Sequence, residues 1–176
     1  MSVHLILGGA RSGKSAMAAQ LARGSGLNAW LIATARAEDA EMAARIARHR
    51  TERSEAAWQV VEEPVRLAHA LLACSRRDRF VVVDCLTLWL TNLLLDPDGE
   101  QRFPGERQAL LDAVSHLPGP VVLVSNETGL GVVPMGAIAR RFVDESGWLH
   151  QELARRCDRV TLMVAGLPFN LKGAVS

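Results

Sequence analysis

The sequence has no tyrosine, four tryptophans, four phenylalanines and three cysteines among its 176 residues. An odd number of cysteines without a C-x-x-C pair predicts neither a disulfide framework nor a zinc knuckle. Cys74, Cys85 and Cys157 are the reduced thiols expected in a reducing compartment. We therefore expect a cytoplasmic protein.

Long apolar runs and a strong charge of either sign are also missing. No run of about 18 apolar residues occurs, so no membrane span is predicted. The opening MSVHLILGG lacks a basic region, and its apolar run is too short for a signal peptide. A net charge of +1 gives no indication of nucleic-acid binding. The hydrophobic content of 49% and the length predict a globular protein with a single domain over residues 1–176.

Short apolar runs alternate with amphipathic segments along the chain. This alternation predicts an α/β fold with a mostly parallel central sheet flanked by helices. The strands are expected at 3–7, 29–33, 80–84, 120–125 and 159–165. The helices are expected at 14–23, 38–50, 64–74, 105–116 and 136–156, with a loop at 96–105, where Asp, Pro and Gly cluster.

The first strand is followed by GGARSGKS, residues 8–15, which fits the phosphate-binding pattern G-x-x-x-x-G-K-[ST]. Its glycines allow backbone N–H groups to turn toward phosphate oxygens, and the following helix N-terminus adds partial positive charge. Lys14 is predicted to neutralise the β- and γ-phosphates, and the Ser15 hydroxyl to ligate Mg²⁺. A chance glycine-rich turn is the alternative.

Two other strand ends carry polar residues where ligands bind in such sheets. Asp84 ends the strand 80–84 and suits the carboxylate on the Mg²⁺ side of a phosphate-binding loop, although it could merely cap a turn. Asn126 and Glu127 follow the strand 120–125 and precede Gly129 and Gly131. From chemistry alone, this segment is as compatible with a plain loop as with a site.

The segment MAARIARHRTER, residues 42–53, reads as a basic helix with one histidine. Arg45, His49 and Arg53 lie four residues apart and share one helical face. Two arginines at this spacing could hold a polyphosphate, and a neutral imidazole between them could act as a nucleophile or a base. A solvated basic face with an incidental histidine is the alternative.

Several motifs occur in an order that resembles one family. They are GGARSGKS, IATA at 32–35, EMAARIARHRTER at 41–53, Trp58-x-x-x-Glu62, VVDCLTLWLTN at 82–92, NETGLGVVP at 126–134 and the terminal GLPFNLK. Together they are similar to the bifunctional adenosylcobinamide kinase / adenosylcobinamide-phosphate guanylyltransferase family of cobalamin biosynthesis. The likeness runs over nearly the whole chain, and His150 followed by Gln151 departs from it, because Asn usually precedes Gln there.

The resemblance implies a P-loop NTPase fold of the RecA-like type, a homotrimer and a transferase with two activities. The first phosphorylates a hydroxyl of the corrinoid adenosylcobinamide with ATP or GTP. The second transfers GMP from GTP to adenosylcobinamide phosphate through a GMP–histidine intermediate and releases pyrophosphate. A P-loop kinase of another small alcohol and a non-catalytic nucleotide switch remain as alternatives.

The same resemblance implies the functional residues. The catalytic histidine corresponds to His49, and Mg²⁺ would be held by Ser15 and Asp84. The residues implied to contact the nucleotide are Gly8, Gly9, Ala10, Arg11, Ser12, Gly13, Lys14, Ser15, Thr34, Ala35, Arg36, Arg50, Thr51, Glu52, Arg53, Glu62 and Asp84.

Overall fold

A computed structural model describes residues 2–36 and 58–173. The strands are β1 (Val3–Gly8), β2 (Asn28–Ala33), β3 (Gln59–Glu62), β4 (Arg79–Asp84), β5 (Val121–Asn126), β6 (Arg159–Val164) and β7 (Leu167–Lys172). They form one sheet in the order β3-β2-β4-β5-β1-β6-β7. All neighbours are parallel except β6 and β7, which are antiparallel. The predicted mostly parallel sheet is therefore confirmed.

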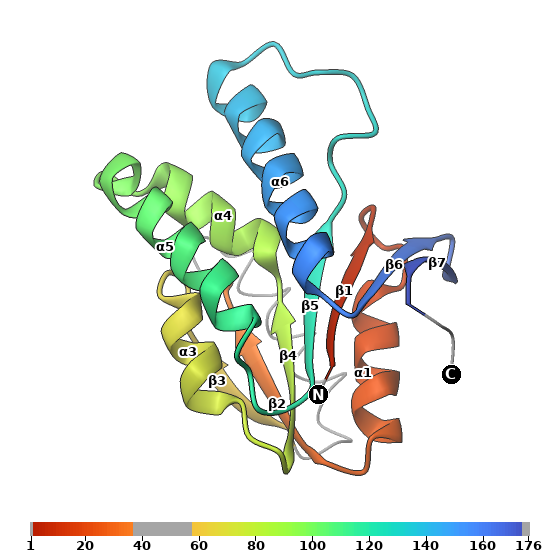
Figure 1. Ribbon diagram of the computed structural model, residues 1–176. Helices are drawn as coiled ribbons and strands as arrows, with labels where there is room; N and C mark the ends of the chain where they lie inside the picture. Colours follow the sequence, from red (N-terminus) through yellow and green to blue (C-terminus); the bar gives the residue numbers. More distant parts are fainter. Residues whose placement is uncertain (1, 37–57, 174–176) are drawn as a thin grey trace.

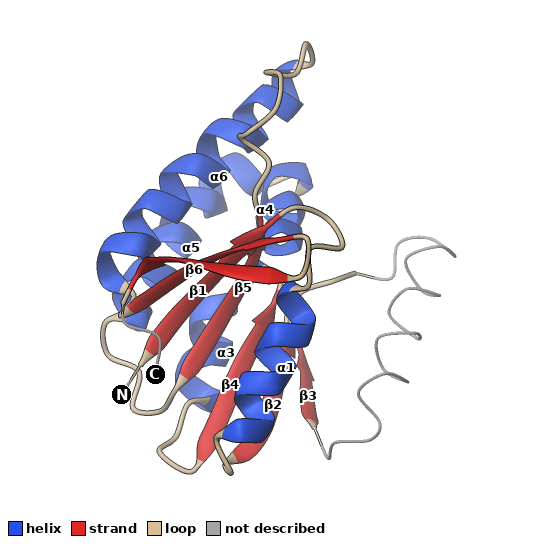
Figure 2. Ribbon diagram, turned by 90° about the vertical axis from the view of Figure 1, so that its right-hand side faces the viewer, coloured by secondary structure: helices blue, strands red, loops and turns tan. Residues whose placement is uncertain are grey.

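Helices cover both faces of the sheet, as Figure 1 shows. Their bounds are α1 (Lys14–Gly24), α3 (Leu67–Cys74), α4 (Leu86–Leu95), α5 (Gly99–Val114) and α6 (Ala137–Arg156). Helix α1 packs on one face, and α3 to α6 pack on the other, as the turned view in Figure 2 makes clear. The central strands are apolar along their whole length because both of their faces are buried.

Two hydrophobic clusters fill the space between the sheet and the helices. Leu5 and its odd-numbered neighbours in β1 face the cluster that includes Trp89 of α4, whereas Ile6 faces the cluster that includes Ala18 and Ala22 of α1. Successive side chains of a strand point to opposite faces, so β1 contributes to both clusters. The small alanines bring α1 close to the sheet, directly behind the loop that connects it to β1.

The five strands predicted from the sequence are present within about two residues of their expected bounds. Strands β3 and β7 were not predicted. Both lie at edges of the sheet, where their residues are largely exposed and the apolar signal is weak. The predicted helix 38–50 lies outside the described residues.

The predicted loop 96–105 is wrong, because α5 begins at Gly99 and continues through Pro104. The Asp96 side chain accepts the N–H of Asp98 at 2.9 Å, and this local bond completes the turn within three residues. Phe103, in the second turn of α5, is 4% exposed and packs into the core. Helix α3 begins at Leu67 rather than at 64, because the Glu63 carboxylate accepts the N–H groups of Val65 and Arg66 in a preceding turn.

The run LTLWLTNLLL, which the sequence left without an assignment, forms α4. Helix α4 packs against β5 and between α5 and α6, so apolar residues surround most of its circumference. A helix buried on several sides shows no clear amphipathic period. Its polar residue Asn92 is also buried, and its side chain donates hydrogen bonds to the segments that follow β2 and β3.

Strand β1 contains a buried histidine, His4, far from the phosphate-binding motif. The Thr161 hydroxyl donates to Asn170 Oδ1 at 3.0 Å, so His4 Nε2–H is the donor in its 2.8 Å contact with Thr161 Oγ1. Burial, with a smaller contribution from Arg159, lowers the pKa of His4 from 6.5 to about 4. His4 is therefore neutral in the folded protein at neutral pH.

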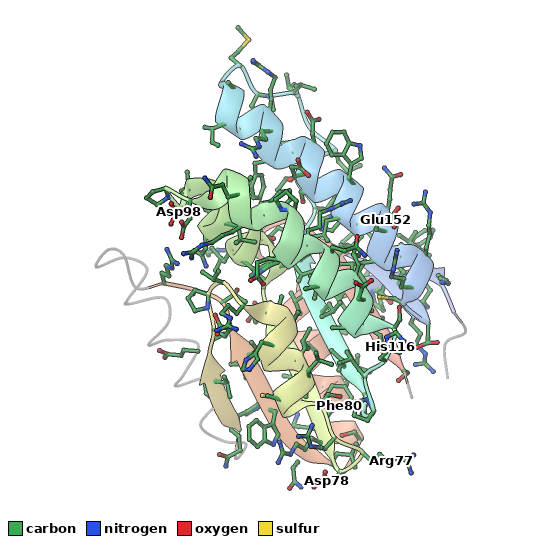
Figure 3. The ribbon with its side chains drawn as sticks, turned by 60° about the vertical axis from the view of Figure 1, so that its left-hand side comes forward. Arg77, Asp78, Phe80, Asp98, His116 and Glu152 are labelled. Atoms are coloured by element: carbon green, nitrogen blue, oxygen red, sulfur yellow. The ribbon has the colours of Figure 1, made fainter. Side chains whose placement is uncertain are left out.

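The lowered pKa of His4 makes the free energy of unfolding depend on pH. Below pH 6.5 the unfolded chain gains a proton that the folded chain accepts only near pH 4, so stability falls as pH decreases through this window. Denaturant melts at pH 7 and pH 4.5 should show the loss, and His4→Gln should reduce it. The exposed His116→Gln, just beyond α5 in Figure 3, is the matched control and should keep the wild-type slope; an unchanged slope in His4→Gln contradicts the prediction.

Candidate nucleotide-binding site

The loop between β1 and α1 has the conformation that its glycines permit. Gly13 has a φ of 99° and Gly8 a φ of 153°, both in a region that favours glycine. A Cβ atom at Gly8 would lie 2.5 Å from the carbonyl oxygen of Met163 in β6. The first motif glycine is thus required by close packing against β6, and the second by the backbone turn that starts α1.

Lys14 begins α1 and is 7% exposed, an unusual degree of burial for a lysine. Its Nζ donates to the carbonyl oxygens of Gly8 at 2.8 Å and Gly9 at 2.6 Å. These bonds hold the ammonium group over the loop that it closes. The loop is also tied from outside, since Gly166 N–H donates to Ser12 O at 3.0 Å. The ammonium group of Lys14 is therefore held by backbone carbonyl groups of a loop that is itself bonded to the segment after β6.

Ser15 and Asp84 come together from different elements. Ser15 lies in the first turn of α1, Asp84 ends β4, and Ser15 Oγ donates to Asp84 Oδ2 at 3.5 Å. A hydroxyl and a carboxylate are hard oxygen donors of the kind that Mg²⁺ prefers. Residues 2–36 and 58–173 contain no group of three or more His, Cys, Asp or Glu side chains suited to a metal.

Thr34, just beyond β2, is fully buried and its side chain bonds the backbone beside Asp84. Its hydroxyl donates to Cys85 O at 2.7 Å and accepts Cys85 N–H at 2.9 Å. Asn92 of α4 donates to Thr34 O at 2.7 Å and to Pro64 O at 2.9 Å. These bonds join the segments that follow β2, β3 and β4 and fix the backbone next to Asp84.

The carboxyl ends of four parallel strands bring most of the predicted site residues to one edge of the sheet. Residues 8–15 follow β1, Thr34 to Arg36 follow β2, and Glu62 and Asp84 end β3 and β4. Glu62 is exposed at the edge strand. The remaining predicted residues lie outside the described part of the chain; they are His49, Arg50, Thr51, Glu52 and Arg53.

A buried polar chain beside this edge was not anticipated from the sequence. His150 Nε2 lies 2.7 Å from Ser125 Oγ, which lies 3.3 Å from Thr87 Oγ1. On its other side, His150 Nδ1 lies 3.8 Å from Glu127 Oε2. The signal for His150 was its place on the buried face of α6 with Ser146, Leu149 and Leu153. Ser125 gave no signal, because it lies near the end of a mostly apolar strand.

Among the described residues, no helix combines the length and the apolarity that crossing a membrane requires.

Comparison with known proteins places the chain in a family. A family described as "Cobinamide kinase / cobinamide phosphate guanyltransferase" matches residues 4–171. The chain is 60% identical to the "Bifunctional adenosylcobalamin biosynthesis protein CobP" of Pseudomonas aeruginosa, over 96% of each chain. It is 39% identical to the "Bifunctional adenosylcobalamin biosynthesis protein CobU" of Escherichia coli, over 96% of this chain and 98% of the relative.

A likeness in fold extends to proteins with little sequence similarity. The RadB recombinase superposes with a TM-score of 0.52 at 17% identity, over 92% of this chain and 73% of the recombinase. This likeness, with the sheet order and the phosphate-binding loop, confirms the predicted P-loop NTPase fold of the RecA-like type. On the match over residues 4–171 and the identities above, the chain belongs to the cobinamide kinase / cobinamide phosphate guanyltransferase family.

Proposed function

We propose which residues of this chain carry out each of the two reactions that give its family its name. One is phosphorylation of adenosylcobinamide by ATP or GTP, and the other is transfer of GMP from GTP to adenosylcobinamide phosphate. The observation that carries the proposal is the convergence of residues 8–15 with Asp84, where Lys14 is held over the loop and Ser15 Oγ lies 3.5 Å from the carboxylate. Phosphoryl transfer depends mainly on such positioning and charge.

The loop after β1 is proposed to bind the nucleotide phosphates. Its N–H groups and the N-terminus of α1 provide hydrogen-bond donors and partial positive charge for an anion. Lys14 would exchange its bonds to the Gly8 and Gly9 carbonyls for bonds to phosphate oxygens. Because the ammonium group is already desolvated in the loop, the electrostatic gain from a phosphate there is larger than in water.

Ser15 and Asp84 would hold Mg²⁺, whose positive charge, when it is bound, neutralises charge on the phosphate oxygens. In the same proposal, Thr34 and Asn92 position Asp84 through the bonds described above. Arg36 and Glu62, at the ends of the neighbouring strands, complete the part of the nucleotide contacts that falls on described residues.

His49 is proposed to carry the guanylyl group. One nitrogen of its neutral imidazole attacks the α-phosphorus of GTP, the bond to the β-phosphate oxygen breaks, and pyrophosphate leaves. A phosphate oxygen of adenosylcobinamide phosphate then attacks the same phosphorus and breaks the P–N bond. Arg50 to Arg53 belong to the same basic segment, in which arginines can stabilise charge on the transferred group.

The location and assembly of the enzyme are part of the proposal. We propose a cytoplasmic homotrimer that takes the corrinoid at the carboxyl edge of the sheet. The segment between β5 and α6 supports the proposed contact with another subunit or with the corrinoid, because Leu130, Val132 and Met135 are between 83% and 97% exposed. Figure 1 shows this segment extending with α6 beyond that edge. Such apolar exposure is typical of a surface that meets a partner or a large ligand.

The experiment that tests the function follows the corrinoid through both steps. The purified chain with Mg²⁺, γ-labelled ATP and adenosylcobinamide should yield labelled adenosylcobinamide phosphate. Addition of GTP should then yield adenosylcobinamide-GDP and pyrophosphate, separated by chromatography. A chain that turns over neither corrinoid would refute the proposed function.

A further inference from the structure

Glu127, the first residue after β5, brings a second carboxylate to the functional edge. Strand β5 is the direct neighbour of β1, with Gly8 in register with Asn126. Glu127 N–H donates to Gly8 O at 3.0 Å, the same oxygen that accepts from Lys14 Nζ at 2.8 Å. The backbone of Glu127 is therefore fixed to the loop that would bind the phosphates.

The roles already assigned leave one chemical task open. Phosphorylation of a hydroxyl requires a group that accepts its proton while the oxygen attacks the γ-phosphorus. Asp84 is turned toward Ser15, on the side proposed for Mg²⁺. Glu62 ends the edge strand β3, with β2, β4 and β5 between it and β1. Within the described part of the chain, Glu127 is thus the strand-end carboxylate that borders the phosphate loop and has no metal-side role.

The Glu127 side chain is held in place while remaining reachable from solvent. Its Oε1 accepts the N–H of Gly129 at 2.7 Å, and its Oε2 lies 3.8 Å from His150 Nδ1. The side chain is 21% exposed, whereas that of His150 is 8% exposed. A carboxylate that is oriented by neighbours and open on one side can meet the hydroxyl of a ligand.

His150 connects Glu127 to the buried hydroxyl chain. Burial lowers the pKa of His150, and the Glu127 charge only partly opposes this, so the imidazole is neutral at neutral pH. His150 Nε2 shares a hydrogen bond with Ser125 Oγ at 2.7 Å, and its other ring nitrogen, Nδ1, lies on the Glu127 side. A neutral imidazole orients the carboxylate without neutralising it, so His150 is a positioning residue.

From this geometry we infer that Glu127 is the catalytic base of the phosphorylation step, an inference that rests on the proposed function. The carboxylate takes the proton of the corrinoid hydroxyl. The hydroxyl oxygen forms a bond to the γ-phosphorus, and the bond from that phosphorus to the bridging oxygen breaks. The nucleoside diphosphate leaves with the electron pair, and the proton stays on Glu127 until it is released to solvent.

The test compares the two reactions in the same variant. Glu127→Gln keeps the size and the acceptor for Gly129 N–H but removes the base, so phosphorylation should fall about 100-fold or more. Guanylyl transfer to supplied adenosylcobinamide phosphate needs no such base and should stay within about threefold of wild type. The loss of phosphorylation rate at acid pH in wild type should be absent from the residual activity of the variant.

Two further variants make the result decisive. Glu152→Gln, on the outer surface near the carboxyl end of α6 in Figure 3, removes a carboxylate paired with Arg155 and Arg156 and should leave both rates unchanged. Glu127→Asp retains a carboxylate and should keep part of the phosphorylation activity together with its acid limb. Thermal melting of each variant identifies a folding defect, and if Glu127→Gln fails to fold, the Asp variant decides.

The outcomes separate the inference from the proposed function. Wild-type phosphorylation in Glu127→Gln, an equal loss of both reactions in a folded variant, or no acid limb in Glu127→Asp would overturn the role of Glu127. In each case wild type would still process both corrinoids, and the proposed function would stand. A wild-type chain that transfers GMP but does not phosphorylate would overturn both the inference and the kinase half of the proposal.

Discussion

Lys14→Ala is expected to lower the rate of adenosylcobinamide phosphorylation by at least about 10² to 10³-fold. Removal of one preorganised donor from a developing negative charge typically costs this much, and Lys14 provides a full positive charge in a desolvated loop. The loss should appear in both kcat and the affinity for nucleotide, because the ammonium group would contact phosphate before and during transfer. Initial rates with ATP and calorimetric titration of the nucleotide measure the two effects.

The chain offers a matched control, because Lys172 is its other lysine. Lys172 Nζ donates to the carbonyl oxygens of Ala154 and Arg155 near the end of α6, so Lys172→Ala removes a lysine that also bonds backbone. Its nucleotide affinity should match wild type. In Lys14→Ala the Gly8 carbonyl still accepts Glu127 N–H, so the fold should persist. Wild-type kinetics for both reactions in Lys14→Ala would refute the assignment of the phosphate loop.

The sequence predicts those strands and helices whose burial produces a regular pattern of apolar and polar residues. Strand β4 reads as RFVVVD because both of its faces are covered, and its acidic end marks the carboxyl edge of the sheet. Helix α4 lacked a pattern for the opposite reason, because its burial on several sides removes the polar stripe. Edge strands such as β7 are stabilised by pairing with one neighbouring strand. Their exposed residues give only a weak apolar signal, so the sequence does not reveal this pairing.

The residues of the candidate site also differ in how well the sequence predicts them. The phosphate loop is a local motif, so its spacing predicted a turn that the structure contains. Thr34 and Asn92 meet across 58 residues of sequence, and no local pattern reports such a contact. The sequence singled out His150 only as a departure from the family pattern, because its partners lie far from it along the chain. Its partners, Ser125 and Glu127, come from β5 and the segment that follows it.

Incubation with Mg²⁺ and α-labelled GTP is expected to leave a covalent label on the wild-type chain and none on His49→Ala. The bond formed would be a phosphoramidate between the imidazole nitrogen and the α-phosphorus, so acid should remove the label. Loss of the nucleophile should lower guanylyl transfer by at least about 10³-fold, since both displacements pass through it. Phosphorylation of adenosylcobinamide does not use this nucleophile and should change only a few fold.

The opposite behaviour of Lys14 and His49 makes the pair of variants informative. Lys14→Ala weakens the binding of phosphates, whereas His49→Ala removes only the atom that carries GMP. His116→Ala, which removes an exposed histidine beyond α5, should label as wild type does and excludes adventitious labelling of surface imidazoles. If wild type takes up no label, or if His49→Ala is labelled equally, GMP does not travel through His49. Retained phosphorylation would then show that the phosphate loop functions and that the guanylyl group is transferred by another route.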